Sequence, residues 1–98
     1  MRYLKYFEFQ IRSEGNIGKF IIGKYRESLV VFKIIETNSK FFNYMDVERY
    51  GYEEDEFKKL GNLYDVYFSS LDVLKVLDNL IDAQKEYDML TFLEKYNI

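Results

Sequence analysis

The sequence predicts an α+β domain in which an antiparallel β-sheet of four to five strands, starting with an N-terminal meander, carries a C-terminal helix packed on one face. Three observations lead to this prediction. Aromatic and β-branched residues alternate with charged ones over the first third of the chain, as in half-buried strands. Residues 29–36, LVVFKIIE, are apolar on both sides of an extended chain, and the residues after Ser69 follow a helical period. We also expect short helices in the middle of the chain and at its C-terminus.

The meander should contain three strands, over residues 3–12, 17–25 and 29–36, joined by turns at residues 13–16 and 26–28. The strand over residues 29–36 has one polar side chain in its interior, Lys33, so it should lie centrally with both faces covered. One helix covers only one of these faces. The other face then requires the middle of the chain, the last helical piece or a second chain.

Helix and strand signals compete in the middle of the chain. Asn43 could cap a short helix that ends just before Gly51, but Phe41, Met45 and Val47 also suit a strand, and the sequence leaves this choice open. Residues 53–60 are expected to form a short helix, because acidic residues fill the first turn and two lysines the last, as the helix dipole favours.

The C-terminal part predicts one more strand and then the main helix. Residues 63–68 alternate as a strand does, with Tyr64, Val66 and Phe68 directed inward. Ser69 can cap a helix that starts near Ser70 and buries one apolar face through about residue 86. That face consists of Val73, Val76, Leu77, Leu80, Ala83 and Tyr87.

The helical period then slips by nearly half a turn, so the remaining apolar residues lie opposite the first face. A break near residues 86–88, where Asp88 can act as a second N-cap, brings both faces to one core and is the expected arrangement. In an unbroken helix the second face becomes a homodimer interface instead. Its residues are Met89, Phe92, Leu93 and Tyr96.

Composition limits the chemistry open to the chain. Its 98 residues without a linker-like segment predict a single globular domain, residues 1–98. The absence of histidine and cysteine removes Ser-His-Asp and Cys-His arrangements, disulfides and typical zinc sites. The carboxylates show no spacing that identifies a catalytic pair or a metal site. We therefore expect no enzymatic activity, no cofactor and no bound metal.

Aromatic content and charge favour a protein that binds another protein. Ten Tyr and nine Phe exceed what the core of so small a domain encloses, so some aromatic surface should face a partner. Residues 1–36 carry seven basic and four acidic residues, a net charge of +3, whereas residues 37–98 carry seven basic and thirteen acidic residues, a net charge of −6. The longest apolar run, residues 29–32, is too short for a signal sequence or a membrane span. This predicts a soluble, cytoplasmic protein with no membrane partner.

The densest acidic segment is residues 53–56, which follow two further carboxylates and two tyrosines. One interpretation is a solvated helix N-terminus. The other is a docking surface for a protein partner with a basic surface, in which tyrosines anchor and carboxylates steer the encounter. This second interpretation predicts a small non-catalytic inhibitor or immunity-type protein, and the composition, typical of an AT-rich genome, suits a phage or mobile-element origin. The predicted partner-binding residues are Asp46, Glu48, Tyr50, Tyr52, Glu53, Glu54, Asp55 and Glu56.

The alternative function is a nucleic-acid or nucleotide binder that uses a basic, aromatic sheet surface. The net charge of −3 makes nucleic acid the less favoured partner, because nucleic-acid binders usually show a clearly basic footprint. Residues 15–18, GNIG, are interpreted as a turn between strands rather than as a nucleic-acid clamp. The residues of this alternative are Tyr3, Lys5, Tyr6, Lys19, Phe20, Lys24, Tyr25 and Arg26.

Overall fold

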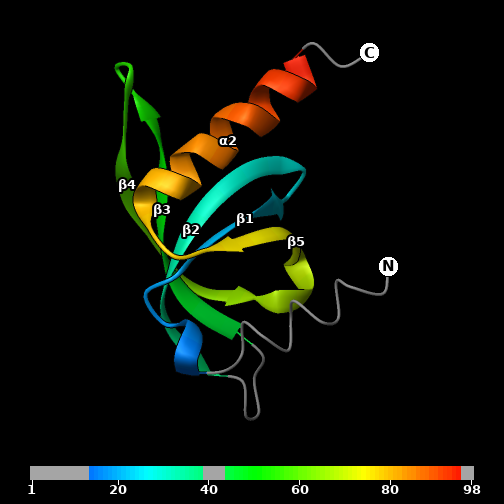
Figure 1. The fold of residues 1–98 in the computed structure, drawn as a ribbon. Helices are drawn as coiled ribbons and strands as arrows, with labels where there is room; N and C mark the ends of the chain where they lie inside the picture. The colour runs from blue at the N-terminus through cyan, green and yellow to red at the C-terminus, as the bar shows by residue number, and fades with distance from the viewer. Residues whose placement is uncertain (1–13, 39–43, 96–98) are drawn as a thin grey trace.

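Five antiparallel strands and one long helix make up the part of the chain that the computed structural model describes, residues 14–38 and 44–95 (Figure 1). The strand order in the sheet is β4-β3-β2-β1-β5, and the predicted α+β fold class is confirmed. The expected strand over residues 3–12 lies outside the described residues. The elements are η1 (Glu14–Asn16), β1 (Phe20–Tyr25), β2 (Ser28–Asn38), β3 (Tyr44–Glu53), β4 (Glu56–Tyr67), η2 (Phe68–Ser70), β5 (Leu71–Leu77) and α2 (Leu80–Lys95).

Strand β2 is the centre of the sheet, and both of its faces are buried, as its sequence predicts. Val31 joins a helix-side core beneath α2, whereas Phe32 and Ile34 join a sheet-side core on the opposite face. All three side chains are fully buried. The helix-side core consists of Phe20, Ile22, Val31, Phe57 and Ala83. The sheet-side core consists of Ile21, Phe32, Ile34, Met45, Val47, Val66, Phe68, Leu71 and Val73.

The sheet covers its own second face by coiling. The sheet-side core draws residues from all five strands and from η2, including Val66 of the β4 edge strand and Val73 of the β5 edge strand. β2 is drawn as a long curved ribbon in Figure 1, and the pairing register shifts at four places, one of them beside Ile35 in β2. Such bulges bend a strand and increase its twist. Among the described residues, side chains of all five strands and of η2 therefore enclose this face of β2.

Two tight turns each join a pair of consecutive strands. Arg26 and Glu27 link β1 to β2, and Glu54 and Asp55 link β3 to β4. All four residues have positive φ angles, between 53° and 69°, which is the signature of two-residue type I′ turns. Asn and Gly are the residues that adopt these angles most easily, and neither occurs in either turn. Both turns therefore hold their residues in an unfavourable backbone conformation.

The expected short helices in the middle of the chain are not confirmed. Residues 53–60 form the end of β3, the turn and the first part of β4 in a β-hairpin, in which Tyr52 pairs with Phe57. The segment from Tyr44 to Gly51, which the sequence left open between helix and strand, belongs to β3. Acidic and basic side chains that suit a helix dipole are also found at exposed positions of strands. The charges of residues 53–60 therefore did not distinguish a helix from a strand.

The main helix begins at Leu80 and not near Ser70. Ser69 and Ser70 lie in η2, and residues 71–77 form β5, which pairs with β1. The true N-cap is Asn79, whose Oδ1 accepts a hydrogen bond from the backbone N–H of Asp82 at 2.9 Å. Half of the predicted first apolar face, Val73, Val76 and Leu77, is therefore strand rather than helix. Only its last three members, Leu80, Ala83 and Tyr87, belong to α2.

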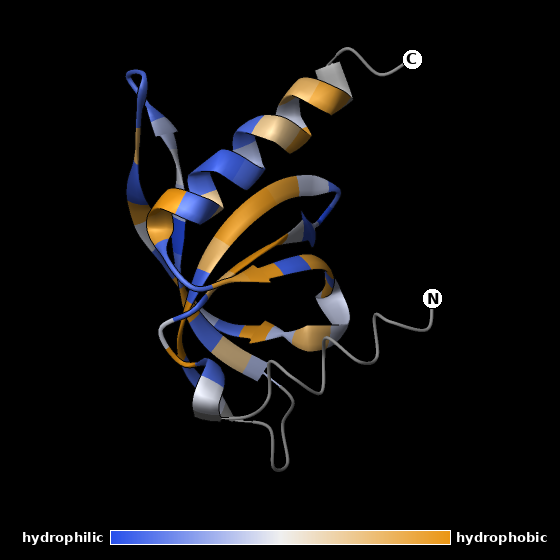
Figure 2. Cartoon of the chain, in the orientation of Figure 1, coloured by the Kyte–Doolittle hydropathy of each residue, from blue (hydrophilic) through white to orange (hydrophobic). Residues whose placement is uncertain are grey.

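Helix α2 runs through residues 86–88 without the expected break. Asp88 does not cap a second helix, because its side chain accepts a hydrogen bond from Tyr52 on β3. The helix therefore carries two apolar faces. Its inner face packs on β1, β2 and β5, and its last turns, partly orange in Figure 2, extend past these three strands. Within the described residues, no helix combines the length and apolar character needed to cross a bilayer.

The inward orientation predicted for Tyr64 is wrong, since its side chain is 70% exposed. A bulge inserts an extra residue in β4 opposite Met45 and Val47 of β3, and this reverses the alternation between Leu63 and Val66. Asp65 adopts a φ of 58° at the bulge, and its N–H donates to Oδ1 of Asp46 at 3.0 Å. Val66 and Phe68 are buried as predicted.

Candidate functional site

The β3–β4 hairpin carries all eight residues predicted to bind a partner. Figure 1 shows this hairpin extending beyond the rest of the sheet beside α2. Side chains at alternate positions of a strand share a face, so four of the predicted residues line the face of β3 that is turned toward α2. These are Asp46, Glu48, Tyr50 and Tyr52. The other four, Glu53, Glu54, Asp55 and Glu56, are all exposed and form what we call the acidic tip.

Tyr52 joins the hairpin to the helix. Its hydroxyl donates to Oδ1 of Asp88 at 2.7 Å and accepts from Nε2 of Gln84 at 3.1 Å. Its ring packs against Phe57 and Tyr87, with centroids 5.1 and 6.2 Å away. The hydrogen bond to Asp88 raises the pKa of Tyr52, although the bond from Gln84 opposes this. The base of the tip is therefore fixed against α2 by both polar and aromatic contacts.

Glu48 is the centre of a charged network on the same face. Its Oε2 accepts from Nζ of Lys59 at 3.2 Å, and its Oε1 accepts from the hydroxyl of Tyr50 at 3.1 Å. Desolvation raises the pKa of Glu48, but the hydrogen bonds from Lys59 and Tyr50 and the charges of Lys59 and Lys33 outweigh it, so the pKa lies below its ordinary value. Burial and the bond to Glu48 raise the pKa of Tyr50. This network links β3 to β4 through the hydrogen bond from Lys59 to Glu48.

We expect Glu48→Gln to reduce the dependence of stability on pH in the acidic range. Because the folded pKa of Glu48 is lowered, its ionised form stabilises the fold above the ordinary carboxyl pKa of about 4.3, and this stabilisation is lost as the pH falls through the folded value. The variant should be less stable by about 1 kcal/mol at pH 7, since hydrogen bonds to a charged group are lost. Urea unfolding at neutral and acidic pH measures both effects. Glu27→Gln, at the exposed β1–β2 turn, is the control and should follow the wild-type profile.

The acidic tip remains open to solvent. Among its four carboxylates, Glu53 receives an ion pair from Nζ of Lys58 at 3.3 Å, and Glu53 also lies directly opposite Glu56 in the pairing of β3 with β4. Like charges in directly opposed positions destabilise a hairpin. The positive φ angles of Glu54 and Asp55 add backbone strain at the same place. Backbone strain and charge repulsion in the hairpin are thus concentrated at the acidic tip, which is also its most exposed part.

A second acidic group lies beside the β4 bulge, around a hollow of about 170 Å³. Its lining includes the carboxylates of Glu36, Asp46 and Asp65. Across residues 14–38 and 44–95, however, no group of three or more such side chains is arranged to hold a metal ion. Asp46 instead stabilises the bulge through its hydrogen bond with Asp65.

The residues of the alternative nucleic-acid surface do not form an open aromatic platform where the structure describes them. Phe20 is 5% exposed in the helix-side core, and the ring of Tyr25 packs edge-on against Phe32 at 5.5 Å. Lys19 pairs with Asp78 at 3.2 Å, and the guanidinium of Arg26 lies over the Tyr25 ring. Tyr3, Lys5 and Tyr6 lie outside the described residues.

Two exposed tyrosines of β4 are not among the eight predicted partner-binding residues, although the alternation of residues 63–68 directs Tyr67 outward. Tyr64 and Tyr67 of β4 are 70% and 52% exposed, and Tyr67 packs edge-on against Tyr44 of β3. The one local signal is Asp65, a residue type that tolerates the left-handed conformation found at the bulge. Comparisons with protein-family models, with curated proteins and with solved structures found no match for this chain.

Proposed function

We propose that the chain is a small non-catalytic binding module that attaches, through its acidic tip, to a protein partner with a basic surface, and acts as an inhibitor or immunity-type protein. The observation that carries the proposal is the concentration of four exposed carboxylates on a strained hairpin that extends beyond the sheet. Natural proteins break local folding rules chiefly at functional sites. The bond from Tyr52 to Asp88 supports the same conclusion, since a pre-oriented site loses less entropy on binding.

The tip chemistry fits a basic partner. Carboxylates at the end of a hairpin attract Lys and Arg side chains and accelerate encounter with a positively charged groove. Tyr52, 44% exposed at the base of the tip, adds an aromatic anchor that keeps its orientation through Gln84 and Asp88. A partner whose basic groove normally binds nucleic acid would be blocked by such a tip.

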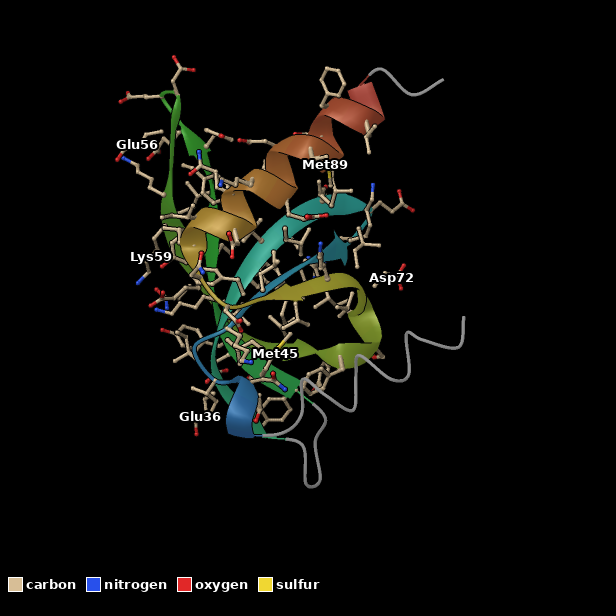
Figure 3. All side chains as sticks on the ribbon, in the orientation of Figure 1. Glu36, Met45, Glu56, Lys59, Asp72 and Met89 are labelled. Atoms are coloured by element: carbon tan, nitrogen blue, oxygen red, sulfur yellow. The ribbon has the colours of Figure 1, made fainter. Side chains whose placement is uncertain are left out.

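The test compares two pairs of charge reversals. Glu54→Lys with Glu56→Lys reverses two of the four charges of the acidic tip, whereas Glu36→Lys with Asp72→Lys makes the same change in net charge on exposed strand positions far from it (Figure 3). Glu53 is left intact because of its ion pair with Lys58. We expect the tip variant to bind the partner at least about a hundredfold more weakly and the control to bind as the wild type does.

The partner is first isolated by comparing what the wild type, the tip variant and the control capture from a cell lysate, and its affinity is then measured by calorimetry with purified proteins. Equal capture by the tip variant and the wild type would contradict the proposal. So would salt-sensitive retention of an oligonucleotide that is lost when Lys19 and Lys24 are changed to Glu, because that result identifies the nucleic-acid surface instead.

A further inference from the structure

Helix α2 exposes an apolar face directly opposite its core contacts. At about 100° per residue, this outer face is turned away from Ala83 and Tyr87, which pack in or against the helix-side core. Figure 3 labels Met89 in the C-terminal half of α2. The apolar members of the outer face are Ile81, Met89, Phe92 and Leu93, which are 67, 47, 60 and 53% exposed. An apolar patch of this kind typically marks an interaction site.

The outer face also contains charges in a defined pattern. Lys85 lies one turn from Ile81 and one turn from Met89, so any partner that covers the apolar residues also covers the lysine. A covered ammonium group requires an opposite charge to offset its desolvation. Asp88, three residues further along and also exposed, carries that charge at the edge of the same face.

We propose that the outer face of α2 pairs with the same face of a second copy of this chain, with the two helices antiparallel about a twofold axis. Positions 81, 85, 88 and 92 follow the alternating spacing of four and three residues that forms the seam of a helix pair. In an antiparallel pair centred between residues 86 and 87, Ile81 faces the partner's Phe92. In the same register Lys85 faces the partner's Asp88, and the twofold axis repeats both contacts. One register therefore pairs two of the four apolar residues, Ile81 and Phe92, and both charges, and leaves Met89 and Leu93 outside the seam.

Asp88 can serve both contacts. The Tyr52 hydroxyl occupies one acceptor position on Oδ1, and an ionised carboxylate offers about four. The size of the face indicates how stable the pair should be. The largest apolar patch of a typical monomer measures about 300–600 Å², so two such patches would together bury about 600–1,200 Å², at or below the lower limit of the roughly 1,200–2,000 Å² that standard stable interfaces bury. We therefore expect a dimer that depends on protein concentration, with a dissociation constant in the micromolar range, and not an obligate dimer.

Sedimentation velocity of the full chain, from about 1 μM to about 1 mM, tests the proposal. The wild type should shift from monomer to dimer over this range. Lys85→Glu places two carboxylates in contact across the axis and Asp88→Lys places two ammonium groups there, so each variant should dimerise at least about tenfold more weakly. An equimolar mixture of the two variants should recover a dimer, because each copy then supplies the charge that the other needs.

Two controls separate the interface from folding. Tyr52→Phe removes the hydrogen bond to Asp88 within one copy and should leave dimerisation unchanged. Ile81→Glu should prevent dimerisation, whereas Ile17→Glu makes the same change at a 45% exposed position in the turn after η1 and should not. Circular dichroism establishes that each variant is folded. A wild type that stays monomeric, single variants that dimerise normally, or a mixture without recovered dimer would each overturn the proposal.

Discussion

Gly23→Ala is expected to lower the free energy of unfolding by about 3 kcal/mol and to detach β5 from the sheet. Gly23 of β1 lies against the backbone of β5 at the point where the β1–β5 register shifts. A Cβ atom there would overlap the carbonyl oxygen of Asp72. A backbone carbonyl cannot rotate aside as a flexible side chain can, so β5 has to move. Leu71 and Val73, which are 2% and 6% exposed, would then leave the sheet-side core.

Urea unfolding followed by tyrosine fluorescence measures this loss of stability, and hydrogen exchange of the β5 amides locates it. Gly61→Ala is the matched control. It lies on β4, where an added Cβ meets no atom within 4 Å, so it should be neutral or stabilising by up to about 1 kcal/mol. Similar stabilities for the two variants would show that β1 and β5 do not approach as closely as described.

Replacing Glu54 and Asp55 with Asn and Gly should have opposite effects on stability and on binding. Asn-Gly is the preferred sequence of a type I′ turn, and relief of two strained φ angles together with the removal of two neighbouring carboxylates should stabilise the fold by about 1–2 kcal/mol. The same change removes two of the four carboxylates of the acidic tip, so affinity for a basic partner should fall about tenfold or more. Thermal unfolding and calorimetry measure the two effects on the same sample.

The β1–β2 turn supplies the control. Arg26 and Glu27 have φ angles of 53° and 69°, against 54° and 69° for Glu54 and Asp55. Changing them to Asn and Gly should stabilise the fold by a similar amount, reduced by the loss of the Arg26 contact with the Tyr25 ring, while binding stays unchanged. A tip variant that gains stability and keeps full affinity would show that the strained turn is not the binding site.

Local pattern was sufficient for the α+β class and for the central strand, because residues 29–36 combine β-branched residues with two apolar faces. The local pattern failed where the apolar residues of a segment can reach the core equally well from a strand or from a helix. In residues 71–77, Leu71, Val73, Val76 and Leu77 suit either structure, and the deciding factor is pairing with β1, which lies about fifty residues earlier. Short segments such as residues 53–60 carry too little periodicity to overcome this ambiguity.

The candidate site shows the same contrast between what local sequence predicts and what depends on long-range contacts. Sequence composition singled out eight residues as a predicted binding surface, and the structure shows that all eight belong to the β3–β4 hairpin. It could not distinguish the exposed tip from the residues committed to internal contacts. The partners of Tyr52 are 36 and 32 residues away, and the partner of Asp46 is 19 residues away. Such long-range contacts follow from tertiary packing, which no local pattern encodes.

The hydroxyl of Tyr52 connects two features that the chain keeps far apart in sequence, the hairpin and α2. Because of this connection, the acidic tip should hold a fixed direction relative to the outer face of the helix. In a dimer formed through that face, two tips would be presented at a set separation. A partner with two basic sites at the matching distance would then gain affinity through avidity, since the second contact forms at a high effective concentration. A single aromatic hydroxyl can thus set the geometry of bivalent recognition.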